Sequence, residues 1–123
     1  MKKTIGSIFP ILLVFTAGYV CSQQGSNMRL AGRIDGGEIP NFRDVAVNGG
    51  YAYLIDNNAS TMSSFFSVYD ISFPTAPLRL SYLKLNQIIE ASGICYQNGY
   101  VFVACADKCV KIIDARNPFS PSE

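Results

Sequence analysis

Few residues of this chain have side chains suited to catalysis. The 123 residues include no histidine, so a Ser-His or Cys-His pair cannot form within the chain, and the commonest general base is missing. Asp70 and Asp114 stand at equivalent places in two similar stretches of sequence. A carboxylate that recurs in this way favours a structural role, in which it accepts backbone N–H bonds in the turn that follows. We therefore predict no catalytic residue and a protein that is not an enzyme.

Three cysteines lie beyond the amino-terminal segment. Cys105 and Cys109 flank a tight turn at 106–108, which would set the two side chains opposite each other on neighbouring strands, near bridging distance. We predict a disulfide between them in an oxidising compartment, and two small buried apolar thiols are the alternative. Cys95 has no evident partner. Three cysteines without histidine or a Cys-x-x-Cys pair form no recognisable zinc ligand set, so we expect no metal and no cofactor.

The segment from Asp56 to Phe65 is a candidate ligand-binding loop, because it holds five residues that its counterpart in the second stretch lacks. A longer polar loop on an economical scaffold is where binding specificity is usually carried. A solvated loop without a ligand is the alternative. The spacing of its acidic and amide residues partly resembles a calcium loop, but the turn glycine and the acidic residue at the twelfth position are missing. The candidate ligand-binding residues are Asp56, Asn57, Asn58, Ser60 and Thr61.

Most of the chain consists of two similar units. DVAVNGGYAYLID over 44–56 aligns with GICYQNGYVFVACAD over 93–107 at an offset of 49 residues, which places Gly50 opposite Gly99. VYDISFPTAP, ending at Pro77, aligns with IIDARNPFSP, ending at Pro121, at an offset of 44. A repeat of roughly 40 to 50 residues that contains several short strands is typical of a β-propeller or a similar array.

Each unit is predicted to contain four antiparallel strands. An Asn/Gly turn near Gly50 or Gly99 joins two apolar runs into a β-hairpin. A third strand ends at Asp70 or Asp114, and the prolines that follow end it because proline lacks a ladder donor. MRLAGRI over 28–34 and LRLSYLKL over 78–85 are expected to be the first strand of each unit. The prolines expected to have this structural role are Pro74, Pro77, Pro118 and Pro121.

At these residues the chain resembles a known repeat. YAYLID, FSVYDISFPTAP, YVFVACAD and VKIIDARNPFSP look like the LVIVD repeat, with a tyrosine-rich strand, a turn, an L-x-I-V-D-like strand and a Pro-x-x-Pro exit. YVTN and related propeller repeats share the tyrosine strand and the IIDxxxNP element. The resemblance implies β-propeller blades, in secreted or surface-exposed prokaryotic proteins whose ligands are mostly unassigned. The expected fold class is all-β: two four-stranded antiparallel blades of an incomplete propeller ring, over 23–77 and 78–121, with a tail at 122–123.

The amino terminus has the pattern of an export signal. Lys2 and Lys3 precede an apolar run over 5–20, and the chain becomes polar at Ser22. A basic start, a short apolar centre and small residues at the boundary are typical of a secretory signal peptide, which we predict as a helix over 1–22. The run is shorter than the roughly 20 residues of a membrane span. We expect an exported protein of the extracellular space, the periplasm or the cell envelope.

Two further observations limit the partners. Gly18-Tyr19-Val20-Cys21 is similar to a lipobox, so lipidation at Cys21 is an alternative to simple cleavage and the only membrane attachment expected. Loss of Lys2 and Lys3 with the leader takes the formal net charge from +1 to −1, which does not favour nucleic acid.

Two units are fewer than the four to eight blades that usually close a propeller. The bare faces predict further blades as partners, either from a longer chain of which this is a fragment or from other copies of the chain. The leading hypothesis is a secreted or cell-surface scaffold that binds a protein or glycan. The alternative is a fragment of a propeller-based periplasmic enzyme, redox or hydrolytic, whose active residues lie outside this chain.

Overall fold

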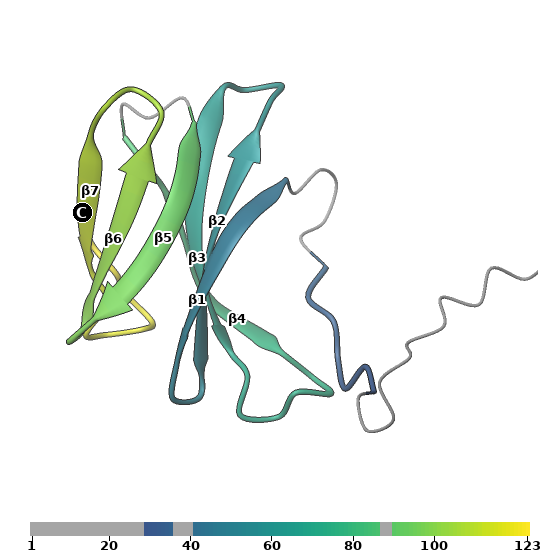
Figure 1. Ribbon diagram of the computed structural model, residues 1–123. Helices are drawn as coiled ribbons and strands as arrows, with labels where there is room; N and C mark the ends of the chain where they lie inside the picture. The colour runs from purple at the N-terminus through teal and green to yellow at the C-terminus, as the bar shows by residue number, and fades with distance from the viewer. Residues whose placement is uncertain (1–28, 36–40, 87–89) are drawn as a thin grey trace, which may run out of the picture.

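The computed structural model describes residues 29–35, 41–86 and 90–123, and within them the chain forms strands and turns without a helix (Figure 1). The predicted signal helix over 1–22 and the lipidation candidate Cys21 lie outside the described residues. In the part of the chain that the structure covers, no helix has the length and apolarity needed to cross a membrane. The all-β prediction is confirmed.

Seven strands form two antiparallel sheets that do not close into a ring within the described residues. The first sheet has the order β1-β2-β3-β4 and the second has the order β5-β6-β7. Figure 1 shows the second sheet beside the first, with β5 near β1 and β2. This agrees with the prediction of incomplete propeller blades. The strands are β1 (Phe42–Asn48), β2 (Tyr51–Asn58), β3 (Ser63–Asp70), β4 (Leu78–Lys84), β5 (Ala91–Gln97), β6 (Tyr100–Cys105) and β7 (Val110–Asp114).

Glycine-containing two-residue turns make the first hairpin of each sheet. Asn98 and Gly99 both have positive φ angles, of 50° and 87°, as a type I′ hairpin turn requires. In the corresponding β1–β2 turn, Gly49 has a positive φ, of 58°, and Gly50 does not. The two turns therefore differ in backbone conformation, although both join neighbouring strands in the predicted register.

The fourth strand of the first sheet differs from the prediction. The repeat spacing assigns residues 78–85 to the start of the second unit, whereas β4 pairs with β3, from Asp70 opposite Leu78 to Phe65 opposite Lys84. The reason is the compact exit turn, in which Ala76 N donates to Phe73 O at 2.9 Å and returns the chain beside the strand it has just left. The boundary between the sheets therefore lies after Lys84.

The strand expected over 28–34 is also absent from the residues that the structure describes. Met28 lies outside them, and residues 29–35 have no strand pairing. Instead, Ile34 packs against Ala52, Leu54 and Tyr69 on the outer face of the first sheet. The described part of the chain therefore has a four-stranded and a three-stranded sheet in place of the expected eight strands.

The exit turns repeat in detail. Asp70 Oδ1 accepts from Ser72 N at 2.8 Å, and Asp114 Oδ1 accepts from Arg116 N at 3.1 Å. The pKa of Asp70 is lowered by its hydrogen bonds from Ser72, and that of Asp114 chiefly by the Arg116 side chain. Asp114 also forms an isolated bridge with Ser122, the counterpart of the pairing between Asp70 and Leu78. The prolines Pro74, Pro77, Pro118 and Pro121 all lie in these exit segments.

The main core lies between the two sheets. Alternate side chains of β2 and β3 face the second sheet, because successive residues of a strand point to opposite faces. The Tyr53 ring, 2% exposed, stacks on Tyr96 with ring centres 4.9 Å apart and on Phe66 at 6.3 Å. The other buried apolar residues of this cluster are Ile55, Val68, Leu85, Ala91, Val101, Val103, Cys105, Ile113 and Ala115.

The outer face of the second sheet is apolar and exposed. Cys95 on β5 is exposed, and Val110 and Ile112 on β7 are 61% and 54% exposed. In the first sheet the equivalent surface is partly covered, with Ala52 and Leu54 buried. The two sheets thus bury one face of each against the other and leave the second sheet with an open apolar side.

Candidate functional site

The candidate site lies at the β2–β3 turn, where the sequence predicts a ligand-binding loop. Strand β2 continues to Asn58 and β3 begins at Ser63, so most of the expected loop is strand and the turn occupies residues 59–62. Asp56 and Asn57 are 7% and 6% exposed. Ser60 and Thr61, in contrast, are exposed in the turn.

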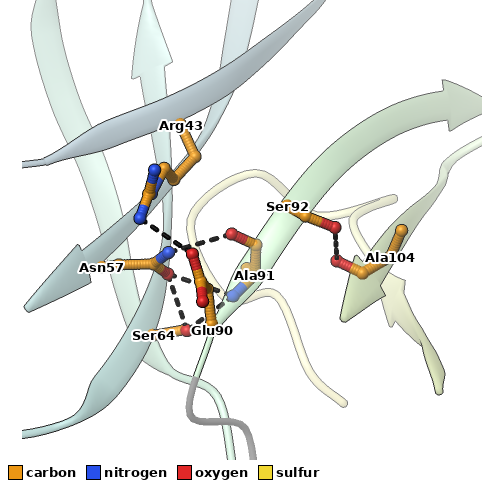
Figure 2. Close-up of polar contacts among 7 residues, drawn as sticks. All are labelled: Arg43, Asn57, Ser64, Glu90, Ala91, Ser92 and Ala104. Atoms are coloured by element: carbon orange, nitrogen blue, oxygen red, sulfur yellow. Dashed lines mark hydrogen bonds and ion pairs between the residues drawn. The ribbon is translucent and has the colours of Figure 1, made fainter. Parts of the chain in front are cut away.

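The side chain of Asn57 connects the two sheets. Its Nδ2 donates to Ala91 O at 2.9 Å, and its Oδ1 accepts from Ala91 N at 3.1 Å. Ser64 Oγ donates to the same Asn57 Oδ1 at 2.8 Å and lies 3.0 Å from Ala91 N. Figure 2 shows these groups around the beginning of β5. A fully partnered buried network of this kind fixes the geometry of the residues around it.

Charged residues of β1 add to this connection. Arg43 Nη2 lies 2.8 Å from Glu90 Oε1 in a partly exposed ion pair (Figure 2), and Asp44 Oδ2 accepts from Ile94 N at 3.0 Å. An exposed ion pair stabilises a fold by only about 0–1 kcal/mol. The Arg43–Glu90 pair therefore matters more for the charge that it places at the surface than for stability.

A surface depression of about 190 Å³ lies above this network. Its walls come from three segments that are distant in sequence: the residue before β1 and β1 itself, the β2–β3 turn, and the residue before β5. Two larger depressions, around Val45 and around Asn117, are more open to solvent. The residues that line the smaller one are Asn41, Arg43, Asn57, Asn58, Ala59, Met62 and Glu90.

The turn that forms one wall of the depression has a defined conformation. Asn58 Oδ1 accepts from Ser60 N at 3.0 Å and from Thr61 N at 3.1 Å, the local pattern by which asparagine stabilises turns. Met62 has a positive φ of 47° and is 71% exposed. The depression thus offers amide groups and one ion pair, which suit a polar ligand, together with one exposed thioether.

Asp56 lies on the opposite face of β2 from Asn57 and does not line the depression. Burial raises the pKa of its carboxyl, and the positive charge of Arg79 opposes that shift. Ser67, on the neighbouring strand β3, has a buried hydroxyl without a hydrogen-bond partner among the described residues. Of the five predicted ligand-binding residues, only Asn57 and Asn58 line the depression, whereas Asp56, Ser60 and Thr61 do not. The binding role of all five stays a prediction.

Cys105 and Cys109 lie close together at the β6–β7 turn. Cys105 is 8% exposed, Cys109 is partly buried, and both are free thiols in the structure. The hydrogen bond between the thiols is the largest cause of a Cys109 pKa raised to about 12, followed by burial. A disulfide between them stays a prediction.

The sequence analysis missed Asn41, Arg43, Met62 and Glu90 as members of the site. Arg43 and Glu90 are 47 residues apart, and only the packing of β5 beside β1 brings them together. A signal was present for Asn57, which continues the face that Tyr53 and Ile55 begin. That alternation indicates a buried strand position and not a loop.

Comparison with known protein families gives one result. The family model described as "LVIVD repeat" matches residues 41–83 and 90–123, more than half of the chain. The first match covers β1 to all but the last residue of β4, and the second covers β5 to β7 and the exit turn. No curated protein and no solved structure gave a significant match. The family match thus divides the chain where the sheets divide.

Proposed function

The chain belongs to the LVIVD repeat family, and from that premise we propose that it is a propeller-repeat scaffold that binds a protein or glycan outside the cell without catalysing a reaction. The repeats and their sheets supply the scaffold. The observation that carries the binding role is the depression at the β2–β3 turn, where Asn57 is held by two hydrogen bonds with Ala91.

The chemistry of the depression favours recognition over catalysis. Arg43 and Glu90 present opposite charges, and Asn41 and Asn58 add amide groups. Hydroxyl-rich glycans and polar peptide segments are recognised by such groups, while an exposed methionine gives an adaptable apolar contact. The lack of histidine in the sequence removes the commonest acid–base catalyst. A preformed depression lowers the entropy lost on binding.

Export and assembly complete the proposal. The basic and apolar pattern over 1–22 supports secretion. The exposed apolar face that contains Val110 and Ile112 supports contact with another blade, from a longer array or from a second copy. The β2–β3 turn belongs to the first sheet and is not part of this exposed face of the second.

Nuclear magnetic resonance can test the binding role. The isotope-labelled exported chain would be titrated with panels of extracellular glycans and polar peptides while the backbone amide signals are recorded. We expect a ligand whose signal changes cluster at Arg43, Asn58–Met62 and Glu90, and whose affinity falls in Arg43→Ala. Arg33→Ala, an exposed arginine in an ion pair outside the depression, is the matched control. Absence of a ligand in both panels, or changes that cluster elsewhere, would contradict the proposal.

A further inference from the structure

The β6–β7 turn gathers three potential metal ligands. The sulfur atoms of Cys105 and Cys109 and a carboxylate oxygen of Asp107 all lie within 4.8 Å of one another. The Cys109 Sγ to Asp107 Oδ1 distance is 3.3 Å. The spacing of the cysteines predicts no metal site, but the fold adds an oxygen donor to the two sulfurs. The cluster is in the second sheet, and none of its members lines the depression at the β2–β3 turn.

The backbone holds the three donors in place. Cys105 N donates to Cys109 O at 3.0 Å, and Lys108 N donates to Cys105 O at 3.2 Å. Lys108 has a φ of 67°, so the loop is the three-residue kind whose last residue is left-handed. Ala106 N donates to Glu90 O at 3.0 Å and ties the turn to the start of β5. The donors are thus positioned before any ion arrives.

Burial is graded across the cluster. Cys105 belongs to the core between the sheets, Cys109 packs against that core, and Asp107 is exposed. One side of the cluster therefore has a low dielectric constant, where interactions with an ion are strong. The exposed side leaves a path for an ion to enter and room for a solvent ligand.

The donor chemistry selects the class of ion. Thiolates are soft ligands that favour zinc and related thiophilic ions, while carboxylate oxygens also serve zinc. Three protein ligands with an open fourth position are a recognised zinc arrangement, with water completing the tetrahedron. We propose that Cys105, Asp107 and Cys109 form a binding site for a thiophilic divalent cation such as Zn²⁺.

The binding step has a simple balance. Each thiol gives its proton to solvent as its sulfur bonds to the ion, so two protons leave for one divalent cation, and Asp107 adds a carboxylate oxygen. Affinity must therefore fall as the pH falls. A disulfide between Cys105 and Cys109 would consume both sulfur ligands, so metal binding and the disulfide exclude each other.

Metal titration of the full chain tests the site. The protein would be purified, reduced without oxygen, and titrated with Zn²⁺ by calorimetry and with Cd²⁺ by the ultraviolet charge-transfer band of the thiolate complex. We expect one ion per chain, release of two protons, and weaker binding at lower pH. Cys109→Ser should abolish the Cd²⁺ band. Asp107→Asn, at an exposed position, should lower the affinity for the ion by at least roughly tenfold. Even the loss of a group that only supports a metal ligand usually lowers affinity by about that much.

The matched control is Cys95→Ser, which removes an exposed thiol from the same sheet and should leave the stoichiometry and affinity unchanged. Circular dichroism would confirm that each variant retains the β fold. Absence of stoichiometric binding by the reduced chain would overturn the site, as would an unchanged Cd²⁺ band in Cys109→Ser. Recovery of the exported protein without metal and with a Cys105–Cys109 disulfide, detected by mass spectrometry, would overturn it as well.

Discussion

Asn57 holds Ala91 as a neighbouring strand would: its side-chain amide donates to Ala91 O at 2.9 Å and accepts from Ala91 N at 3.1 Å. The two residues belong to different sheets and are 34 positions apart. A side chain here replaces backbone pairing at the point where β5 begins. The contact therefore links the two LVIVD units through hydrogen bonds as well as through apolar packing.

Removal of this amide should weaken the fold. Asn57→Ala leaves the N–H and C=O of buried Ala91 with fewer partners, so we expect a loss of about 1–3 kcal/mol in the free energy of unfolding. Urea denaturation followed by circular dichroism measures it. Gln97→Ala, which removes an exposed amide from β5, should change stability by no more than about 0.5 kcal/mol. Equal effects of the two substitutions would show that the amide contact is unimportant.

Neutralising Asp56 should stabilise the protein at neutral pH. Burial raises the pKa of this carboxyl in the folded state, so the folded chain binds the proton more tightly than the unfolded chain, and stability decreases as the pH rises through the folded-state pKa. Asp56→Asn removes that penalty. Its advantage over the wild type should shrink as the pH falls through the folded-state pKa and should be gone below about 4, the ordinary pKa range of aspartate.

The comparison for Asp56 is Asp35→Asn, which alters an exposed carboxylate. Both variants and the wild type would be unfolded in urea at pH 7 and at several lower values. An Asp56→Asn variant that is less stable than the wild type at pH 7 would indicate that the charge of Asp56 has favourable partners that outweigh its desolvation.

Alkaline conditions should expose the environment of Tyr53. Burial, followed by the influence of Tyr96, raises the pKa of Tyr53 to about 12, above the ordinary value of about 10. Its contribution to stability is complete below pH 10 and is lost as the pH rises toward 12. Tyr53→Phe should make the decline of stability between about pH 10 and 12 shallower. Tyr51→Phe, a half-buried position on the same strand, should have a smaller effect on that slope.

The two hairpin glycines should differ in their tolerance of a methyl group. Gly49 and Gly99 both have positive φ, so alanine at either costs about 1–2 kcal/mol. At Gly49 the added Cβ meets nothing within 4 Å, whereas at Gly99 it would lie 2.5 Å from Arg116 Cγ. We expect Gly99→Ala to be more destabilising in urea unfolding. In the Gly99→Ala background, Arg116→Ala should remove the steric part of the loss in stability. A double-mutant cycle in which the two substitutions change the free energy of unfolding additively would contradict this explanation.

Much of the fold could be predicted from local chemistry. The turns at Gly49 and Asn98, the apolar alternation through Tyr53, and the strand ends at Asp70 and Asp114 predict antiparallel hairpins in sequence order. The phase of the repeat could not be predicted. In a periodic sequence the starting point of a unit is arbitrary. The sequence therefore assigns residues 78–84 equally well to the unit before them and to the unit after them. Only hydrogen bonding to β3 assigns them to the first sheet.

The candidate site was predictable only in part. A polar run beginning at Asp56 indicated the region of the turn that Asn58 stabilises, and its binding role stays a prediction. The contribution of Arg43 and Glu90 depends on packing between sheets, for which no local pattern exists. The contribution of Asp107 could not be predicted either, because the spacing of the cysteines does not indicate where the turn places the carboxylate that lies between them in sequence.

The contact between Asn57 and Ala91 has a consequence for how the chain unfolds. In a linear array of repeats, cooperativity depends on the free energy of coupling between nearest neighbours relative to the intrinsic stability of each repeat. Here a buried side-chain amide of the first repeat forms hydrogen bonds with the main chain of the second. Unfolding of either repeat therefore removes hydrogen-bond partners from the other. We therefore expect the two repeats to denature in a single transition, with the amide contributing part of the free energy that couples them.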